Sequence, residues 1–269
     1  MRTDLAVECL NSDKILPEGV SCLTQPLGAG KLTIVVISTE QAQKKIGKPK
    51  GMYITMELPP FWDERSDTAQ LAEAMAEALR QLLPEQGAVL VAGLGNRDIT
   101  PDALGPLTAE KILVTRHLAD VFPDLRTVAA ISPNVLGKTG METVETVHAV
   151  TEEVQPAAVI VVDALAAGSL ERLGTTVQLA DSGIVPGAGV LNARKALNKS
   201  TLNVPVIALG IPTVVDLSNL CKDTDGEPMM TTPRQVDLLI RRGADFLGLV
   251  INRALHPDLS REEILLLQN

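Results

Sequence analysis

The sequence predicts an α/β protein in which helices cover a mostly parallel β-sheet. Three observations lead to this fold class. Aromatic residues make up only 2% of a chain that is 45% hydrophobic. The apolar runs are short and no polar residue interrupts them, which is typical of parallel strands buried on both faces. Segments with helical periodicity separate these runs, as in right-handed strand-helix-strand crossovers. At 269 residues, we expect one domain covering residues 1–269.

The first third of the chain predicts three strands and a helix. Residues 32–38 (LTIVVIS) and 52–58 (MYITMEL) read as strands separated by a basic loop. A helix follows, capped by Asp67 and ended by Pro84, because apolar residues recur between them at helical spacing. The apolar run at residues 88–92 predicts a strand buried on both sides.

The remainder continues the alternation. A glycine- and proline-rich loop at residues 93–106 precedes a helix that we expect to reach about Leu118. Three further strands are predicted, and two further helices. Thr139 and Glu142 have the spacing of a capping box for the first helix, and Thr232 with Pro233 resembles the start of the second. The strands are expected at residues 127–131, 157–162 and 204–209.

Charge and cysteine content limit the function classes. A net charge of −9 argues against binding to nucleic acid phosphates, which requires a basic surface. Cys9, Cys22 and Cys221 are widely spaced and predict free thiols in a reducing compartment. The first ten residues contain no apolar run of a secretory signal, and no segment approaches the roughly 20 apolar residues that span a bilayer. We therefore expect a cytoplasmic protein.

Three loops are candidates for a functional site, because sites in such sheets lie at the carboxyl ends of the strands. They are residues 93–106, 163–169 and 181–189, and each contains an aspartate. Asp102 lies in the first loop, although an ordinary role as a first-turn acid behind Thr100 is an alternative. Asp163 ends an apolar strand, where a charge is costly unless it is paired or functional. A cap on the following turn is the alternative for Asp163.

The two aspartates together suggest more chemistry than either alone. Two neighbouring carboxyl groups cannot easily both ionise, so one retains a proton. The ionised group can then activate a water while the protonated one polarises a carbonyl. Such a pair titrates as a unit, so the acid and the base are not assigned from sequence.

Other motifs carry weaker signals. The GAGK sequence at residues 28–31 lacks the glycine spacing and the Ser or Thr of a phosphate loop. His117, His148 and His256 have no metal-ligand spacing, so we predict no metal and no cofactor. No serine or cysteine lies in a nucleophile motif.

Six short segments stand out: RTDLAVE at residues 2–8, TPDALGP at 100–106, KTGMET at 138–143, VDALAA at 162–167, DSGIVPGAGV at 181–190 and GIPTVVD at 210–216. On these segments, and more weakly over residues 229–256, the sequence resembles a known family, the germination proteases of spore-forming bacteria, which are atypical aspartic endopeptidases. The resemblance implies a three-layer α/β sandwich of the phosphorylase/hydrolase-like group, shared with hydrogenase-maturation proteases.

The resemblance also implies an activity. It implies cleavage of small acid-soluble spore proteins during germination, in the forespore or spore core, by a homo-oligomer such as a tetramer that is made as a zymogen. The family's two essential aspartates correspond to Asp102 and Asp163. Gly95, Asn96 and Gly183 are predicted to line the substrate site, because glycines let backbone N–H groups approach a carbonyl. Only about a dozen residues separate Asp216 from Met229, where typical members carry a longer insertion.

Two alternatives remain open at this point. One is a metal-dependent maturation-type peptidase on the same fold. The other is a non-catalytic protein that binds basic or disordered peptides on its acidic surface.

Overall fold

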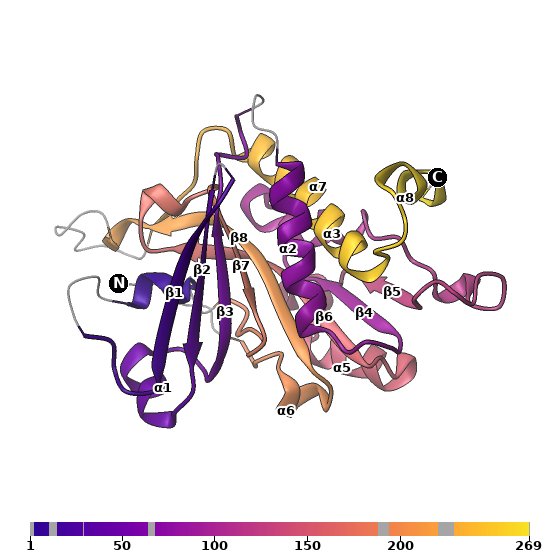
Figure 1. The fold of residues 1–269 in the computed structure, drawn as a ribbon, viewed down its shortest axis with the longest axis horizontal. Coiled ribbons are helices and arrows are strands. Elements are labelled where there is room, and N and C mark those ends of the chain that lie inside the picture. The colour runs from indigo at the N-terminus through magenta and orange to yellow at the C-terminus, as the bar shows by residue number, and fades with distance from the viewer. Residues whose placement is uncertain are drawn as a thin grey trace.

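The computed structural model describes residues 3–10, 15–28, 30–63, 68–187, 194–219 and 229–268. Within these residues one mixed sheet has the strand order β1-β2-β3-β7-β8-β6-β4-β5, with β9 paired to β8. Helices lie on both of its faces (Figure 1). No helix in these ranges is long and apolar enough to span a bilayer.

Four strands form the parallel half of the sheet. They are β4 (Val89–Gly93), β5 (Val128–Ile131), β6 (Ala158–Ala167) and β8 (Val206–Asp216), joined by the parallel pairs β5/β4, β4/β6 and β6/β8. Every residue of β4 is buried. A continuous apolar run predicted this, because a strand covered on both faces has no polar side.

The other half of the sheet is antiparallel. It consists of β1 (Val20–Leu27), β2 (Gly30–Ile37), β3 (Gly51–Glu57) and β7 (Thr176–Ala180), and β7 joins it to β8. A short strand, β9 (Met230–Thr231), also pairs antiparallel with β8. The predicted α/β class is confirmed, but fewer strands are parallel than expected. β1 and β2 form a hairpin, and the chain returns antiparallel from β2 to β3 through the short helix α1 (Glu40–Ile46).

Alternate residues of the central strands face two different helical layers. Val91 and Ile160 pack in the core beneath α2 (Ala69–Leu82) and α7 (Val236–Leu255), which contact each other. The neighbouring residues Leu90, Ala92, Val159 and Val161 pack on the opposite face, where α5 and α6 lie. Because successive side chains of a strand point to opposite faces, a separate core forms on each side of the sheet. The remaining helices are α1 (Glu40–Ile46), α3 (Leu104–Ala109), α4 (Leu136–Thr139), α5 (Thr143–Val154), α6 (Lys199–Leu202) and α8 (Arg261–Leu267).

Several predicted boundaries are wrong. The helix expected to reach Leu118 ends at Ala109, because the Asn252 side chain of α7 accepts from Leu113 N–H and donates to Lys111 O, which turns the chain into the core. The long C-terminal helix begins at Val236, after Gln235, instead of at Pro233. Asp67, the predicted cap of α2, lies outside the described residues, and Thr68 precedes the helix.

The predicted capping box is also displaced. Thr139 ends α4, where Gly140 adopts a left-handed conformation with φ of 72°. Glu142 is the N-cap of α5, and its N–H donates to the Glu145 carboxylate at 3.0 Å. The box therefore begins three residues later than the sequence predicted.

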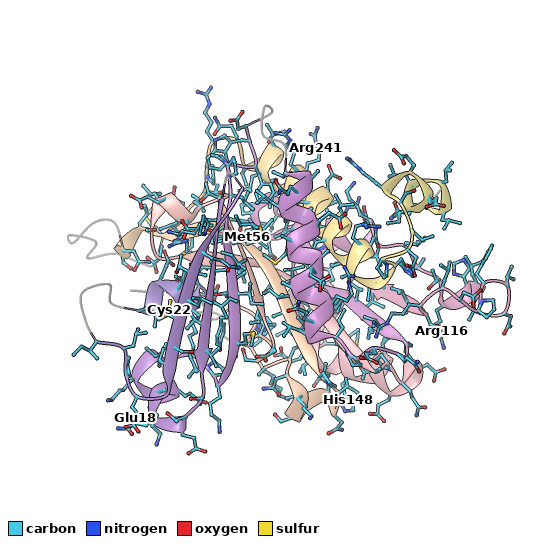
Figure 2. The ribbon with its side chains drawn as sticks, viewed as in Figure 1. Glu18, Cys22, Met56, Arg116, His148 and Arg241 are labelled. Atoms are coloured by element: carbon cyan, nitrogen blue, oxygen red, sulfur yellow. The ribbon has the colours of Figure 1, made fainter. Side chains whose placement is uncertain are left out.

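The cysteines within the described ranges are free. Cys9 is half-buried, and Cys22, labelled in Figure 2, is exposed on β1, the outer strand of the sheet. Cys221 lies outside the described residues. Gly30 and Lys31 begin β2, so this part of the GAGK sequence enters a strand and not the helix that follows a phosphate loop.

Candidate active site

Asp102 lies on the glycine-rich loop that follows β4. It ends a single 3-10 turn, Thr100–Asp102, just before α3. No side chain caps this turn and Ala103 precedes α3, so the alternative in which Thr100 caps a helix is wrong. The Asp102 carboxylate is half-buried, and its Oδ2 accepts from the Asn96 N–H at 2.7 Å. Asp102 is thus held by the backbone of its own loop.

Gly95 permits this close approach. Its φ is +113°, and a Cβ atom there would lie 2.0 Å from the Asp102 carbonyl oxygen. No other residue type fits a contact of that length, and side chains rarely adopt that backbone conformation. Gly95 therefore allows the loop to fold back on Asp102.

Asp163 lies within β6, not after it. The strand continues to Ala167 by pairing with β8, and Asp163 is opposite Gly210. The prediction that residues 163–169 form a loop is wrong, and so is the alternative in which Asp163 caps a turn. However, β4 ends at Gly93, opposite Val162. Asp163 is therefore the first residue of β6 beyond the carboxyl end of β4.

The two aspartate segments meet at this point. Leu94 N–H donates to Val162 O at 2.8 Å, and the 3-10 turn that carries Asp102 contacts β6. Alternation along β6 places Asp163 on the same face as Val161 and Leu165. The structure thus brings the two predicted aspartates to one edge of the parallel half of the sheet.

Burial raises the pKa of both carboxyl groups, and the negative charge of Asp102 adds to the effect on Asp163. Asp163 is 6% exposed, and burial raises the pKa of its carboxyl well above the usual value, with added contributions from the negative charges of Asp102 and Asp4. Burial also raises the pKa of Asp102, while the hydrogen bond from Asn96 N–H opposes that rise. The environments therefore favour a proton on Asp163 and a charge on Asp102.

A cavity of about 150 Å³ lies on the same face of the sheet as Asp163. Leu165, two residues after Asp163, and Gly210, its neighbour on β8, both line it. Gly183 also lines the cavity, with a φ of +74°. Gly95 and Asn96 do not line it, and neither do Asp102 and Asp163 themselves. Of the three predicted lining residues, Gly183 borders this space and the other two shape the Asp102 loop.

Sequence reasoning missed the contribution of the N-terminal segment. Asp4 lines the cavity, its N–H donates to Ala166 O, and its Oδ2 accepts from Ala166 N–H, both at 2.8 Å. Gln178 of β7 holds the same segment, accepting from Ala6 N–H and donating to Asp4 O. The only sequence signal was the RTDLAVE motif, which does not reveal a partner about 160 residues away.

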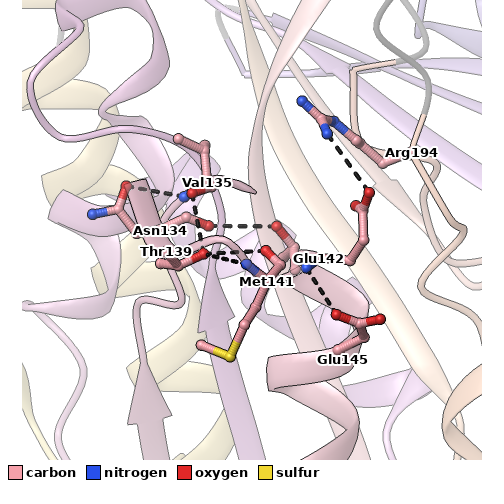
Figure 3. A network of polar contacts seen from close by, with 8 residues as sticks. Asn134, Val135, Thr139, Met141, Glu142, Glu145 and Arg194 are labelled. Atoms are coloured by element: carbon pink, nitrogen blue, oxygen red, sulfur yellow. Dashed lines mark hydrogen bonds and ion pairs between the residues drawn. The ribbon is translucent and has the colours of Figure 1, made fainter. Parts of the chain in front are cut away.

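Two ion pairs join the α4–α5 segment to neighbouring loops, and Figure 3 draws the second of them, between Glu142 and Arg194. Lys138 pairs with Asp98 of the Asp102 loop at 2.7 Å, and Glu142 pairs with Arg194 at 3.7 Å. Two residues after Arg194 in the sequence is Ala196, which lines the cavity. The KTGMET sequence therefore spans the space between the Asp102 loop and the cavity.

The histidines lie apart from these loops. His117 is in a short 3-10 helix, and His148, labelled in Figure 2, is on α5. His256 is buried at the C-terminal end of α7, and burial lowers its pKa to about 4. Within the described ranges no three His, Cys, Asp or Glu side chains form a cluster that could hold a metal ion.

Comparison with known proteins places the chain in a family. Residues 11–226 match the family model described as germination protease. The chain belongs to the germination protease family. The family predicted from the loop motifs is therefore confirmed, and with it a peptidase as the class of enzyme.

Individual members of the germination protease family match over nearly the whole chain. The germination protease of Caldanaerobacter subterraneus subsp. tengcongensis is 37% identical over 314 residues, covering 98% of this chain and 97% of the relative. That of Clostridium tetani is 38% identical over 318 residues, covering 98% of both. Both alignments are longer than this chain, so these germination proteases contain residues that it lacks.

One solved structure is also similar. The [NiFe] hydrogenase maturation protease HycI from Thermococcus kodakarensis is 16% identical, with a TM-score of 0.40, covering 65% of this chain and 98% of that one.

Proposed function

We propose that this protein is an endopeptidase that degrades small acid-soluble spore proteins during germination, with Asp102 and Asp163 as its catalytic residues. The observation that carries the proposal is a convergence of two segments: the loop with half-buried Asp102 begins at Leu94, whose N–H donates to Val162 O beside buried Asp163. Membership of the germination protease family supports the peptidase class. The aspartic mechanism, the substrate and the spore core as the place of action belong to the proposal.

The different surroundings of the two carboxyl groups support a division of roles. Asp102 accepts from Asn96 N–H, which favours its ionised form, so it acts as the general base. Asp163 is buried beside two other acidic residues, so it keeps its proton and acts as the general acid. Because the pair is coupled, its pKa values belong to both groups together.

The reaction consumes only the peptide and one water molecule, and both aspartates return to their starting protonation states. Asp102 takes a proton from a water molecule while the water oxygen bonds to the peptide carbonyl carbon. Asp163 gives its proton to the carbonyl oxygen, which forms a tetrahedral diol. In the second step Asp163 takes back a hydroxyl proton, the C–N bond breaks, and Asp102 protonates the leaving nitrogen.

The cavity beside Asp163 offers a place for a substrate side chain. Gly183, Leu165 and Gly210 line it, and a side chain bound there would place the adjacent peptide bond near Asp163. We propose Gly183 as a substrate-binding position on this basis. Gly95 and Asn96 fit a supporting role for Asp102 better than substrate contact.

The experiment is cleavage of a purified small acid-soluble spore protein, with and without a chelator, after each variant is shown to be folded. Asp102→Asn and Asp163→Asn should each lose on the order of 10³-fold in rate, within the range of general acid–base catalysis. Asp245→Asn, which removes an exposed carboxylate on α7, is the matched control and should cleave normally.

The outcomes separate the alternatives. Chelator-resistant cleavage that both substitutions abolish supports the aspartate pair. Cleavage that survives either substitution contradicts it, and loss with chelator that a divalent ion restores favours the metal-dependent peptidase. Binding without cleavage by the wild type favours a non-catalytic role.

A further inference from the structure

Asn96 directs three of its polar groups into the Asp102 loop. The residue as a whole is 8% exposed. Its N–H donates to Asp102 Oδ2 at 2.7 Å, its Oδ1 accepts from Asp98 N–H at 3.0 Å, and its carbonyl accepts from Ile99 N–H at 3.1 Å. A further bond, from Asp102 N–H to Ile99 O at 2.8 Å, closes the loop. Asn96 is therefore at the centre of the contacts that return the chain to Asp102.

The chemistry of asparagine suits this position. A side-chain oxygen that accepts from the N–H two residues later forms a short turn that Asn, Asp and Ser favour. Gly95, just before it, leaves room for the Asp102 carbonyl. The N–H, the Oδ1 and the carbonyl oxygen of Asn96 all bond to residues of the same loop, so these contacts serve the loop.

We propose that Asn96 is a positioning residue, which fixes the Asp102 carboxylate for catalysis by holding the turn that directs its backbone N–H at that group. The inference rests on the proposed role of Asp102 as a catalytic residue. It replaces the sequence-based prediction of Asn96 as a residue that lines the substrate site.

The ion pair outside this turn contributes little to the positioning. Lys138 and Asp98 meet at 2.7 Å, but their side chains are 49% and 68% exposed. Water and salt screen such exposed pairs, and their effect on stability is small. The backbone contacts around Asn96 therefore determine the shape of the loop.

The hydrogen bond from Asn96 also has an electrostatic consequence. It lowers the pKa of the Asp102 carboxyl against the effect of burial. The 3-10 turn that carries Asp102 contacts α3, α7, β6 and β8. On these described elements, Asp163 of β6 is the titratable group whose pKa the charge of Asp102 raises. On the loop itself, Arg97 pairs with Glu110 and Asp98 with Lys138. Loss of the bond from Asn96 should therefore raise the pKa of Asp102.

The test compares three substitutions of Asn96 in the full chain, by kcat, KM and the pH dependence of cleavage. Asn96→Ala should lower kcat by about 100-fold, as expected for a misplaced catalytic group, with KM nearly unchanged and the acidic limb of the profile moved to higher pH. Asn96→Ser should restore most of kcat, because its hydroxyl can accept from the same N–H.

Asn96→Gln separates positioning from substrate contact. It keeps the amide but adds one methylene, so it cannot form the same two-residue turn and should behave like the alanine variant. Thr39→Ala is the control, since it also removes one local side-chain acceptor, from Ala42 N–H at 3.1 Å at the start of α1. Its rate and pH profile should match those of the wild type.

Three results would overturn the inference. They are an alanine variant with a normal kcat and acidic limb, a serine variant no better than alanine, or a glutamine variant as active as serine. If Asn96→Ala does not fold, the serine and glutamine variants still decide. Failure of the proposed function is a different result, because it requires Asp102→Asn to remain active.

Discussion

Asp102 lies on a loop and Asp163 on a buried strand, and the protein supports their carboxyl groups in different ways. Asp102 receives a hydrogen bond from the backbone of its own loop, which stabilises the charged form. Asp163 is surrounded by the sheet and lies beside two other acidic residues, and the donor to its carboxyl group is the N–H of the next residue, Ala164.

This difference suggests how two identical side chains take different roles. A loop can aim backbone N–H groups at a carboxylate, because its own N–H groups are not used by a sheet. A strand commits its N–H groups to neighbouring strands, so it can bury a carboxyl group but offers few donors. The loop therefore favours the base and the strand favours the acid.

The largest effect short of removing an aspartate is expected at Gly95. Gly95→Ala places a Cβ 2.0 Å from the Asp102 carbonyl, so the loop must move and Asp102 with it. We expect a fall in kcat of about 100-fold, measured by cleavage of the spore protein. Gly137→Ala in α4 is the matched control, because nothing lies within 4 Å of its added Cβ. Equal rates for the two variants would show that the loop does not position Asp102.

The pH dependence of cleavage should separate the two aspartates. Activity should fall at low pH as Asp102 gains a proton, and this limb should lie above the ordinary aspartate range because burial raises the pKa of Asp102. Activity should fall at high pH as Asp163 loses its proton, and its pKa is raised well above the usual value. A rate that rises continuously with pH would contradict a protonated Asp163.

A smaller effect concerns stability. Because the pKa of Asp163 is raised in the folded protein, the folded state binds this proton more tightly than the unfolded chain, and the free energy of unfolding falls as pH rises above the ordinary aspartate pKa. Asp163→Asn removes that dependence. Its Tm should exceed that of the wild type by at least about 2 °C near neutral pH, and the difference should shrink as the pH falls towards 4. A less stable variant at all pH values would contradict the proposed cost of burying Asp163.

The smallest effect is expected for the exposed ion pair. Lys138→Met removes the partner of Asp98 but leaves the hydrogen bonds around Asn96 in place. It should move Tm by less than about 2 °C and leave the acidic limb of the pH profile unchanged. A shift of that limb as large as the one expected for Asn96→Ala would show that the ion pair, and not the turn, positions Asp102.

The sequence predicted the part of the fold that holds the site better than the rest. Continuous apolar runs identified β4 and β6, since burial on both faces leaves no polar positions. The same argument drew attention to Asp163 at the end of such a run. β1 was missed because six of its eight residues are exposed, so it shows neither alternation nor an apolar run.

Other features depend on contacts that no local pattern contains. The continuation of β6 past Asp163 follows from pairing with β8, which overrides the loop-like sequence DALAAGS. The role of Asn96 depends on a turn of a few residues whose hydrogen bonds a sequence does not show. Asp4 accepts a hydrogen bond from Ala166 N–H, although the two residues are far apart in the sequence. Only the folded protein brings them together.

The most direct measurement is a carboxyl carbon NMR titration of aspartate-labelled protein, for the wild type, Asp102→Asn and Asp163→Asn. In the wild type, one coupled pair of carboxyl groups should titrate in two steps, with the upper step well above the ordinary aspartate value. Asp163→Asn should remove the upper step, and Asp102→Asn should lower it, because the charge that opposes ionisation of Asp163 is then gone. Two aspartates that titrate independently at ordinary values would contradict the catalytic pair.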